Sequence, residues 1–502
     1  MSTNIRSLPS RWPGRVPLWP AVMLPVITLC AWAIAAGGQA LRGLVLSGLG
    51  WLLALPLLVS LEAGLIAMML FEPLRGVIRR AQYLFVDYSN SDPIHLLTPI
   101  VALFAFILLL KNQRLDIFRQ SRLAPAVSLL LLIYFIQIFN PLQGGLVIGL
   151  SGALFMLLPV LWFYFGQAVK SDFLRTALRL MVVMGLITSL YGVYQLLFGL
   201  TSFDQFWLDH SEYNNWVRVA GVVRAMATYA NAEEWSRYLD ICALGALGLA
   251  VMANRYAHRI AWFACGMVLF GALILSGERV SIFGFLMGSA ILLLSGARTP
   301  GGIVRRSALL LIPALLLFVF AKPPAEGEIG ENEQSQAAQS MVSHSARGVL
   351  KPTGEGSLYA RFENWGEVSK VILYHPLGLG TGAGSIAQTR EGNGVGNLPT
   401  TDSYVLSVAL ACGIPAGLLC LWIFGHATLI SWRAFRRAAP GSHESGMWRV
   451  MLAIMPVLAF INLFGYSFVL VSVAPVGWLL IGWVSAEELR IRAESEREII
   501  TI

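Results

Sequence analysis

The chain is poor in charge. Only 13% of its 502 residues are Asp, Glu, Lys or Arg, whereas 56% are hydrophobic. Ordinary soluble domains carry about 25% charged residues. The mean hydropathy is +0.67. Apolar runs recur along nearly the whole length, and many approach the roughly 20 residues of a membrane-spanning helix. The composition therefore excludes a soluble protein and predicts an all-α, polytopic transmembrane helical bundle.

Cysteine is scarce, and metal-binding motifs are missing. The five cysteines lie inside apolar runs without a CxxC spacing, which is typical of small buried residues and argues against disulfides or a zinc site. The sequence has no HExxH, no DxD and no His/Cys cluster of ligand spacing. It also lacks a Walker loop and a GxSxG elbow. We therefore expect no metal, no cofactor and no direct use of ATP.

The net charge of +8 has two explanations. Basic proteins often bind nucleic acid, but no cluster of aromatic and basic residues supports such a surface here. Membrane proteins also collect Lys and Arg in their cytoplasmic loops, and this explanation suffices. We expect no nucleic-acid partner.

The apolar runs predict about 12–14 spans. They lie at 18–36, 44–59, 60–72, 96–110, 124–140, 146–166, 177–199, 238–253, 259–276, 280–296, 306–321, 403–430, 447–468 and 471–486. The 44–72 stretch fits either one long helix or two short ones. The predicted organisation is N-terminal transmembrane helices at 1–199, a first polar loop at 200–237, central helices at 238–321, a large polar loop at 322–402, C-terminal helices at 403–486 and a tail at 487–502.

Basic residues indicate the orientation of the bundle. Five basic loops alternate correctly if all face the cytoplasm, those containing Lys111, Lys170, Arg255, Arg298 and Arg433. Both termini then lie in the cytoplasm of a bacterial cell, and the two polar loops lie on the periplasmic side of the inner membrane. One loop, with Arg75, Arg79 and Arg80, disagrees because it falls on the outer side. Either 44–72 is miscounted, or these arginines act on the outer face.

Both polar loops are long enough to be functional. Residues 323–356 are polar with little apolar content, so we expect this part to be mobile. Residues 357–375 predict an amphipathic helix that ends at Pro376, because four apolar residues recur at helical spacing, namely Phe362, Trp365, Val368 and Ile372. Outside the membrane, such a helix can lie on the bilayer surface or pack against the bundle as a lid.

The first polar loop combines arginines with aromatic residues. Arg218, Arg224, Tyr229 and Asn231 stand out there. The planar guanidinium group suits phosphate and pyrophosphate, and aromatic rings suit sugar faces. The alternative is an aromatic belt at the membrane interface with ordinary surface charges.

Two further positions combine charge with a membrane boundary. Glu278 and Arg279 lie between two spans without a real loop, so they need a polar partner or a water-filled cavity, unless they form a turn at the headgroup level. Asp402 lies where the chain re-enters the membrane, either as a general base or as a helix N-cap.

The segment between the predicted helix and the next span is rich in glycine. His375 precedes it and can titrate near neutral pH, although a lone histidine is more often structural. Glycines at 378, 380, 382 and 384 resemble a phosphate-binding loop only superficially. Without a preceding strand and a following helix, they indicate a flexible turn.

Several stretches occur in an order known from one family. They are RAMATYANAEEWSRYL (224–239), LSGERVSIFGF (275–285), ARFENWGEVSKVILYHPLGLGTGAG (360–384) and TDSYVLSVALACGIPAGLL (401–419). An arginine, a tryptophan four residues on, Pro-Leu-Gly-x-Gly and a Gly-Ile-Pro-Gly-like helix follow one another. The chain resembles the O-antigen polymerase and O-antigen ligase superfamily of membrane glycosyltransferases. The likeness covers residues 218–430, and the first 200 residues match only in being membrane helices.

The resemblance implies a GT-C-like fold and metal-independent transfer of a glycan from undecaprenyl pyrophosphate to an acceptor sugar in the periplasm. It implies that Arg224 and Arg361 hold the pyrophosphate. Asp402 and then His375 are the candidates for the general base. The candidate substrate-binding residues around them are Arg218, Arg279, Glu278, Asn231, Tyr229, Trp365 and Tyr359. Ligases typically carry a histidine where this chain has 401–403, which weakens a ligase assignment.

Three functions stay open besides a non-catalytic scaffold. The first is polymerisation of lipid-linked oligosaccharide repeat units into a surface or exopolysaccharide. The second is a ligase that transfers the glycan to lipid or protein. The third, a flippase for lipid-linked sugars, is disfavoured because the sequence shows no internal repeat and its polar residues gather in outer loops. The expected partners are the lipid-linked oligosaccharide, an acceptor glycan and the bilayer, with a chain-length regulator or export complex as a further candidate.

Overall fold

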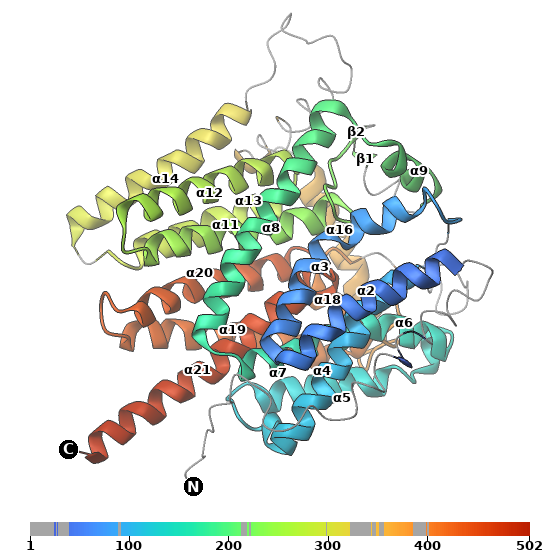
Figure 1. Ribbon diagram of the computed structural model, residues 1–502, viewed down its shortest axis with the longest axis horizontal. Helices are drawn as coiled ribbons and strands as arrows, with labels where there is room; N and C mark the ends of the chain where they lie inside the picture. Colours follow the sequence, from blue (N-terminus) through green and yellow to red (C-terminus); the bar gives the residue numbers. More distant parts are fainter. Residues whose placement is uncertain are drawn as a thin grey trace, which may run out of the picture. The chain divides into compact units, whose positions relative to one another are not determined.

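The computed structural model describes residues 25–26, 28, 40–88, 92–211, 218–219, 222–297, 299–321, 343, 348–350, 356–384, 398 and 401–501. Within these residues the fold is all-α apart from one short antiparallel ladder, which confirms the predicted helical membrane fold (Figure 1). Most of the expected first span at 18–36 lies outside the described residues, as does most of the 323–356 segment.

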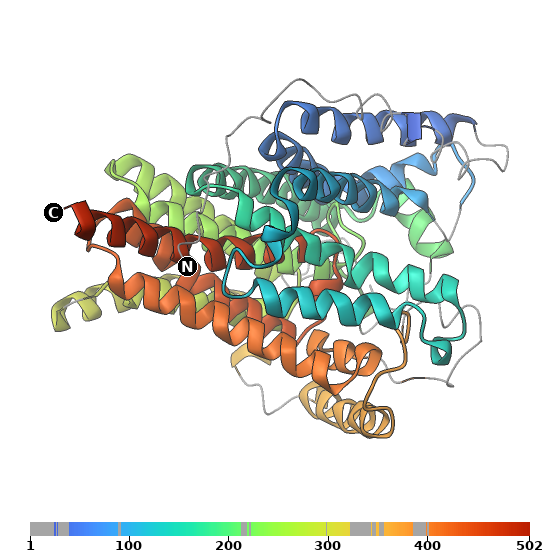
Figure 2. The ribbon, with the colours of Figure 1, turned by 90° about the horizontal axis from the view of Figure 1, so that it is seen from below.

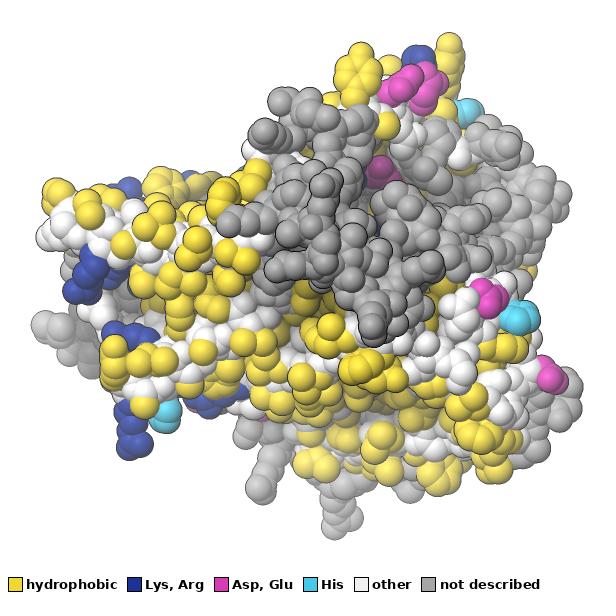
Figure 3. Space-filling view, turned by 90° about the horizontal axis from the view of Figure 1, so that it is seen from above, with side chains coloured by type: hydrophobic (Ala, Val, Ile, Leu, Met, Phe, Trp, Pro, Cys, Tyr) yellow, Lys and Arg dark blue, Asp and Glu magenta, His cyan; other side chains and the backbone are white. Residues whose placement is uncertain are grey.

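Nine of the described helices are long and apolar enough to cross a membrane, and two shorter apolar helices are Ala124–Gln137 and Arg279–Leu294. Hydrophobic side chains cover much of the described surface on the face shown in Figure 3. Helix α14 (Pro300–Ala321) is typical, because Val304 and Leu311 on it are largely exposed. A surface of this kind suits contact with lipid. The chain is therefore a multi-pass membrane protein.

The chain divides into two compact units, each built from separate stretches. Unit 1 comprises the described residues of Ala102–Ser171 and Glu355–Ile502, and unit 2 those of Ser10–Val101 and Asp172–Gly354. Helix α4 (Leu97–Gln113) begins in unit 2 and ends in unit 1.

Unit 2 holds the helices before α4, helix α8 and the central helices. Its elements are α2 (Ala40–Val59), α3 (Leu61–Gln82), η1 (Pro93–Leu96), α8 (Ser171–Phe198, from its second residue on), α9 (Ser202–His210), β1 (Arg218–Val219), β2 (Val222–Val223), α11 (Ala232–Met252), α12 (Tyr256–Leu275), α13 (Arg279–Leu294) and α14 (Pro300–Ala321). In the ladder Arg218 pairs with Val223 and Val219 with Val222. The expected polar loop at 200–237 thus contains a helix, a hairpin and the start of α11.

The 44–72 stretch consists of two helices. Helix α2 ends at Val59, and the Ser60 hydroxyl caps α3 by accepting a hydrogen bond from the Ala63 amide at 3.0 Å. Because α3 continues to Gln82, Arg75, Arg79 and Arg80 lie on a helix and not in a loop. The prediction that these arginines lie in a loop is therefore wrong. Their charges are neutralised by buried acidic partners, which are described below.

Unit 1 holds the C-terminal helices and the helices between α4 and α8. Its elements are η2 (Arg114–Phe118), α5 (Ala124–Gln137), η3 (Pro141–Gln143), α6 (Leu146–Met156), η4 (Leu158–Val160), α7 (Leu161–Ala168), α16 (Gly356–Tyr374), α18 (Tyr404–Cys412), α19 (Ile414–Arg437), α20 (His443–Leu463), η6 (Ser467–Val469) and α21 (Ala474–Thr501). The expected tail at 487–502 continues α21.

The predicted span at 403–430 is broken in two. Gly413 has a φ of +90° and separates α18 from α19. The two helices pack closely because Gly417 has no side chain: a Cβ there would lie 2.9 Å from that of Ala409. The break therefore makes α18 a short separate helix whose first turn begins near Asp402.

Helix α16 (Gly356–Tyr374) covers nearly the same residues as the helix predicted at 357–375. Val368 and Ile372 are buried and pack with Leu379, Ala409 and Leu410 into one cluster. Figure 2 shows the tan α16 next to the orange helices of the same unit. This packing holds the helix in place. It therefore also positions Trp365 and Arg361, which lie one and two turns before Val368 on the same face.

Candidate functional site

Arg361 and Asp402 come together in unit 1. The Nε atom of Arg361, on α16, lies 3.5 Å from Oδ2 of Asp402, and their side chains are 29% and 49% exposed. A partly hydrated ion pair of this kind contributes about 0–1 kcal/mol. Both groups can therefore change partners when a charged ligand arrives.

Asp402 does not cap α18. The N-cap is Ser403, whose hydroxyl accepts a hydrogen bond from the Leu406 amide at 3.4 Å. The N-cap alternative for Asp402 is thus wrong, because the helix begins one residue later than that alternative required. Asp402 keeps a half-exposed carboxylate whose partner is Arg361.

Trp365 lies one turn after Arg361 on the same side of α16. Its ring packs against Phe464 with centroids 5.6 Å apart and against the edge of Phe362 at the same separation. Phe464 is the residue that follows α20. The aromatic contact therefore fastens the Arg361 end of α16 to the end of α20.

The glycine-rich segment is a packed turn and not a flexible one. The Leu379 and Gly380 amides donate to Leu410 and Ala411 carbonyl oxygens at 3.0 and 2.8 Å. The Gly382 amide donates to the Gln143 side chain at 3.0 Å. Because protein acceptors already hold these N–H groups, the turn does not offer them to phosphate.

Glycine is needed here for conformation and for space. Gly378, Gly380 and Gly384 have φ values of +91°, +109° and +71°, which other residues rarely adopt. A Cβ on Gly382 would lie 2.4 Å from the Ile148 carbonyl oxygen on α6. The turn therefore holds α6 against the end of α18 in unit 1.

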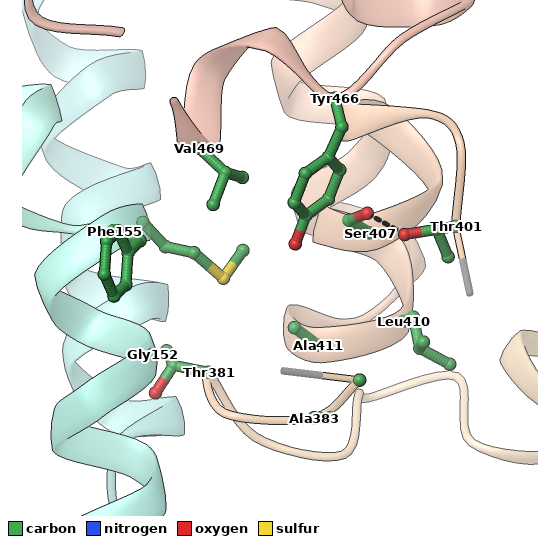
Figure 4. A pocket seen from close by; sticks show the side chains of 12 residues that line it. Gly152, Phe155, Thr381, Ala383, Thr401, Ser407, Leu410, Ala411, Tyr466 and Val469 are labelled. Carbon is green, nitrogen blue, oxygen red and sulfur yellow. Dashed lines mark hydrogen bonds between the residues drawn. The ribbon is translucent and has the colours of Figure 1, made fainter. Parts of the chain in front are cut away.

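A pocket lies between α6, the glycine-rich turn, α18 and the turn after α20 (Figure 4). Its described lining is Gly152, Phe155, Met156, Thr381, Ala383, Gly384, Thr401, Ser407, Leu410, Ala411, Tyr466 and Val469. None of these residues is charged, and four carry hydroxyl groups. In Figure 4 the Tyr466 hydroxyl points into the pocket, and the Thr401 and Ser407 hydroxyls contact each other.

The lining suits a neutral, hydroxylated ligand, because hydroxyl groups both donate and accept hydrogen bonds and Phe155 offers an aromatic surface. Thr401 is the residue before Asp402. The pocket therefore lies next to Asp402, the ion-pair partner of Arg361. Sequence reasoning missed Ser407 and Tyr466, because no local pattern marks a hydroxyl on an apolar helix or turn as part of a pocket.

His375 and Tyr359 lie apart from this arrangement. His375 follows the last residue of α16, so about 20 Å of helix separates its backbone from that of Arg361. It is not among the described residues that line the pocket. Tyr359 is also on α16, but its side chain is largely exposed.

In unit 2 the structure pairs Arg224 with Glu278. The guanidinium group of Arg224 contacts the carboxylate of Glu278, and both side chains are mostly buried. Arg279, the next residue, begins α13. Gly348 lies against Arg279, since a Cβ there would come within 2.5 Å of its Cζ atom. Two segments of unit 2 that are distant in sequence thus meet at 278–279.

The remaining candidates of the first polar loop have structural positions. The Asn231 side chain caps α11 by accepting a hydrogen bond from the Glu234 amide at 2.7 Å. Tyr229 is buried against Tyr238, and burial raises the pKa of its phenol well above 10. A neutral, enclosed phenol is a poor proton acceptor at physiological pH. Of Arg218 the structure describes only its backbone in β1.

Buried charges on α3 fix the turn after Arg224. Arg80 is 1% exposed and its Nε lies 2.5 Å from Oδ1 of Asp204, while its two terminal nitrogens donate to the Ala227 and Tyr229 carbonyl oxygens. The Gln195 side chain accepts from the Ala227 amide at 2.8 Å and donates to Asp204 at 2.9 Å. Ala227 has a φ of +48°, so these contacts hold an unusual backbone conformation.

Similar pairs neutralise the other arginines of α3. Arg75 contacts Glu72 at 2.9 Å, and Arg79 lies 3.4 Å from Asp92. In the sequence, arginines within an apolar region indicate that buried acidic partners are needed. Their distant partners could not be read from spacing along the chain.

Comparison with known proteins gives one family. Residues 264–422 match the protein family described as O-Antigen ligase. A search of curated proteins found no match for the chain. The matched segment includes Arg279, Arg361 and Asp402, whereas Arg224 lies before it. The match confirms the resemblance noted above for this part of the chain.

Proposed function

Because residues 264–422 form an O-antigen ligase family domain, we propose that this membrane protein polymerises lipid-linked oligosaccharide repeat units by glycosyl transfer from undecaprenyl pyrophosphate. The domain supports an O-antigen ligase- or polymerase-type function. The observation that carries the proposal is the Arg361–Asp402 pair next to a hydroxyl-lined pocket.

The reaction requires two kinds of group. The acceptor hydroxyl oxygen attacks the anomeric carbon of the donor sugar, and the bond from that carbon to the phosphate oxygen breaks. The pyrophosphate leaves with the electron pair, so its developing charge needs a cation. The acceptor proton needs a base within hydrogen-bond reach. Arg361 supplies the cation, and Asp402 supplies the base.

The loose pairing of these two residues suits both roles. Without substrate, each neutralises the other at 3.5 Å. Pyrophosphate carries more charge than one carboxylate and accepts two parallel N–H bonds from a guanidinium group. Substrate binding therefore draws Arg361 towards the pyrophosphate and leaves the Asp402 carboxylate available to the acceptor hydroxyl.

The pocket provides a place for the acceptor sugar. Its lining is uncharged, its Tyr466 hydroxyl points inward, and Thr401 connects it to Asp402. A sugar bound there is recognised through its hydroxyl groups, while Arg361 recognises the charged donor. Arg224, paired with Glu278, is a separate candidate for binding anions in unit 2.

Ligase activity is the second candidate. The matched family is described as O-Antigen ligase, which favours transfer of the finished glycan to a different acceptor. Polymerase remains first because residues 401–403 are Thr-Asp-Ser, whereas ligases resembling this chain typically have a histidine there. In either case we propose an inner-membrane protein whose reaction takes place on the periplasmic face without a metal ion. No group of three His, Cys, Asp or Glu side chains within the described part of the chain could hold one.

One assay separates the possibilities. Purified protein is incubated with lipid-linked oligosaccharide, with and without a separate lipid acceptor. Longer lipid-linked chains indicate a polymerase, and glycan on the added acceptor indicates a ligase. Movement of the intact substrate across a liposome membrane without a new glycosidic bond indicates a flippase and contradicts the proposal.

A further inference from the structure

Helix α16 has an exposed apolar face in addition to its packed one. Val368 and Ile372 lie in the core cluster of unit 1. Phe362 and Leu373 are 53% and 71% exposed. They are separated by about three helical turns, so they share one side of the helix, which differs from the packed side. A helix buried only against its own protein does not need this second apolar side.

The third side of α16 is charged. The Lys370 amine lies 2.7 Å from the Glu367 carboxylate, and their side chains are 66% and 59% exposed. Glu367 lies about a third of a turn around the helix from Leu373, whereas Lys370, three residues before Leu373, lies at the edge of the apolar side. The exposed part of the helix therefore passes from an apolar side to a charged side. This division is typical of a helix that lies along a membrane surface, with one side in lipid and the other in water.

The apolar side continues into the membrane-facing surface of unit 1. Leu377, three residues after the helix ends, is also exposed. Its carbonyl oxygen accepts a hydrogen bond from the Gln137 side chain at 2.7 Å, at the end of the apolar helix α5. Phe135 and Phe139 beside Gln137 are exposed as well.

The turn after α16 also contacts a candidate membrane-spanning helix, α19. The Ile414 amide, at the start of α19, donates to the Pro376 carbonyl oxygen at 2.9 Å. Helix α19 is long and apolar enough to cross a membrane, and Leu418 and Trp422 on it are exposed. The end of α16 therefore lies at the same depth in the membrane as the start of α19.

We propose that α16 lies in the headgroup region of the bilayer, with Phe362 and Leu373 in lipid and Glu367 and Lys370 in water. The partner of this surface is the membrane itself. This location does not depend on the reaction. Together with the proposed function it explains how Arg361, on the packed side, is held at the depth of a lipid-bound pyrophosphate.

Photo-crosslinking tests the proposal. The photoreactive residue benzoylphenylalanine is placed at Leu373 or, as the matched control, at Glu367, and the full-length protein is reconstituted into phosphatidylethanolamine–phosphatidylglycerol vesicles. Both positions are exposed on the same helix, so both variants should fold. We expect several-fold more phospholipid adduct, measured by mass spectrometry, at Leu373 than at Glu367. Phe362 is a second position that should behave like Leu373.

Three outcomes overturn the proposal. Absent phospholipid adducts at Leu373 and Glu367 would place the whole helix in water, and equal adducts would show that lipid contacts both sides alike. A protein adduct at Leu373, either to a second copy of the chain or to another polypeptide, would make this face a protein interface. None of these outcomes bears on the proposed reaction, because catalytic activity is measured separately with lipid-linked oligosaccharide.

Discussion

The guanidinium group of Arg361 lies 3.5 Å from the carboxylate of Asp402, although a helix and a glycine-rich turn separate the two residues in the chain. Each residue was a candidate for a different step of glycosyl transfer. Their contact means that a change in one alters the surroundings of the other. The experiments on them therefore need variants that separate charge, shape and stability.

Arg361→Lys should lower glycan formation strongly. Lysine keeps the charge but loses the planar fork that holds a pyrophosphate through two parallel bonds. A charge-assisted contact made in the transition state contributes roughly 3–4 kcal/mol, or about 10²–10³ in rate, by analogy with oxyanion-hole donors. The measurement is the initial rate of polymer formation by equal amounts of purified wild-type and variant protein.

Lys370→Ala is the matched control for Arg361. It removes a cation from the same helix, but Lys370 pairs with Glu367 on the charged side. Such exposed pairs contribute about 0–1 kcal/mol, so activity should be unchanged. Near-normal activity of Arg361→Lys and Arg361→Ala would show that Arg361 is only a surface residue.

Asp402→Asn and Ser403→Ala should have opposite effects. The first keeps the shape of the side chain but removes its basicity, so activity should fall while thermal stability changes little. The second removes the buried N-cap of α18 and should lower stability by about 1 kcal/mol, with activity retained by the folded protein. Full activity of a folded Asp402→Asn variant would eliminate Asp402 as the base.

His375→Gln should keep activity within a few-fold of wild type. The backbone of His375 lies about 20 Å along α16 from that of Arg361, too far for both side chains to act on one glycosidic bond. The test is the initial rate of polymer formation by equal amounts of folded wild-type and variant protein. A loss of about 10²-fold or more in the variant would restore His375 as the proton acceptor.

Arg80→Ala should destabilise the protein far more than Arg175→Ala. Arg80 and its partner Asp204 are 1% and 0% exposed, and removal of one partner leaves a buried charge, which costs about 3–5 kcal/mol. Arg175 pairs with the exposed Asp172 in the same unit, so its loss should cost about 0–1 kcal/mol. Thermal unfolding in detergent measures both. Equal unfolding temperatures would mean that the Arg80 network does not hold unit 2 together.

Local patterns predicted the elements better than their contacts. The helix expected at 357–375 is α16, because its apolar spacing is a property of the segment itself. The break at Gly413 was missed although Pro415 follows it, and proline near a helix start is a recognisable signal. Because apolar residues flank Gly413 on both sides, the stretch was predicted as one continuous span.

Long-range contacts could not be predicted from spacing. Arg80 is neutralised by Asp204 from a different helix, and nothing in the surrounding sequence identifies that partner. Hydropathy alone therefore placed the arginines of α3 in a loop. The same limit applies to Arg361 and Asp402, since the sequence predicted both as candidates but not their contact.

The most direct test of the account is the release of undecaprenyl pyrophosphate during glycan elongation. Purified wild-type protein, Arg361→Lys, Asp402→Asn and Lys370→Ala are each incubated with lipid-linked oligosaccharide, and the released lipid and the chain length are measured together. We predict one lipid released for each new glycosidic bond with the wild type and Lys370→Ala, and a loss of about 10²–10³ in rate with Arg361→Lys. Elongation without lipid release, or equal rates in all four proteins, would contradict the account.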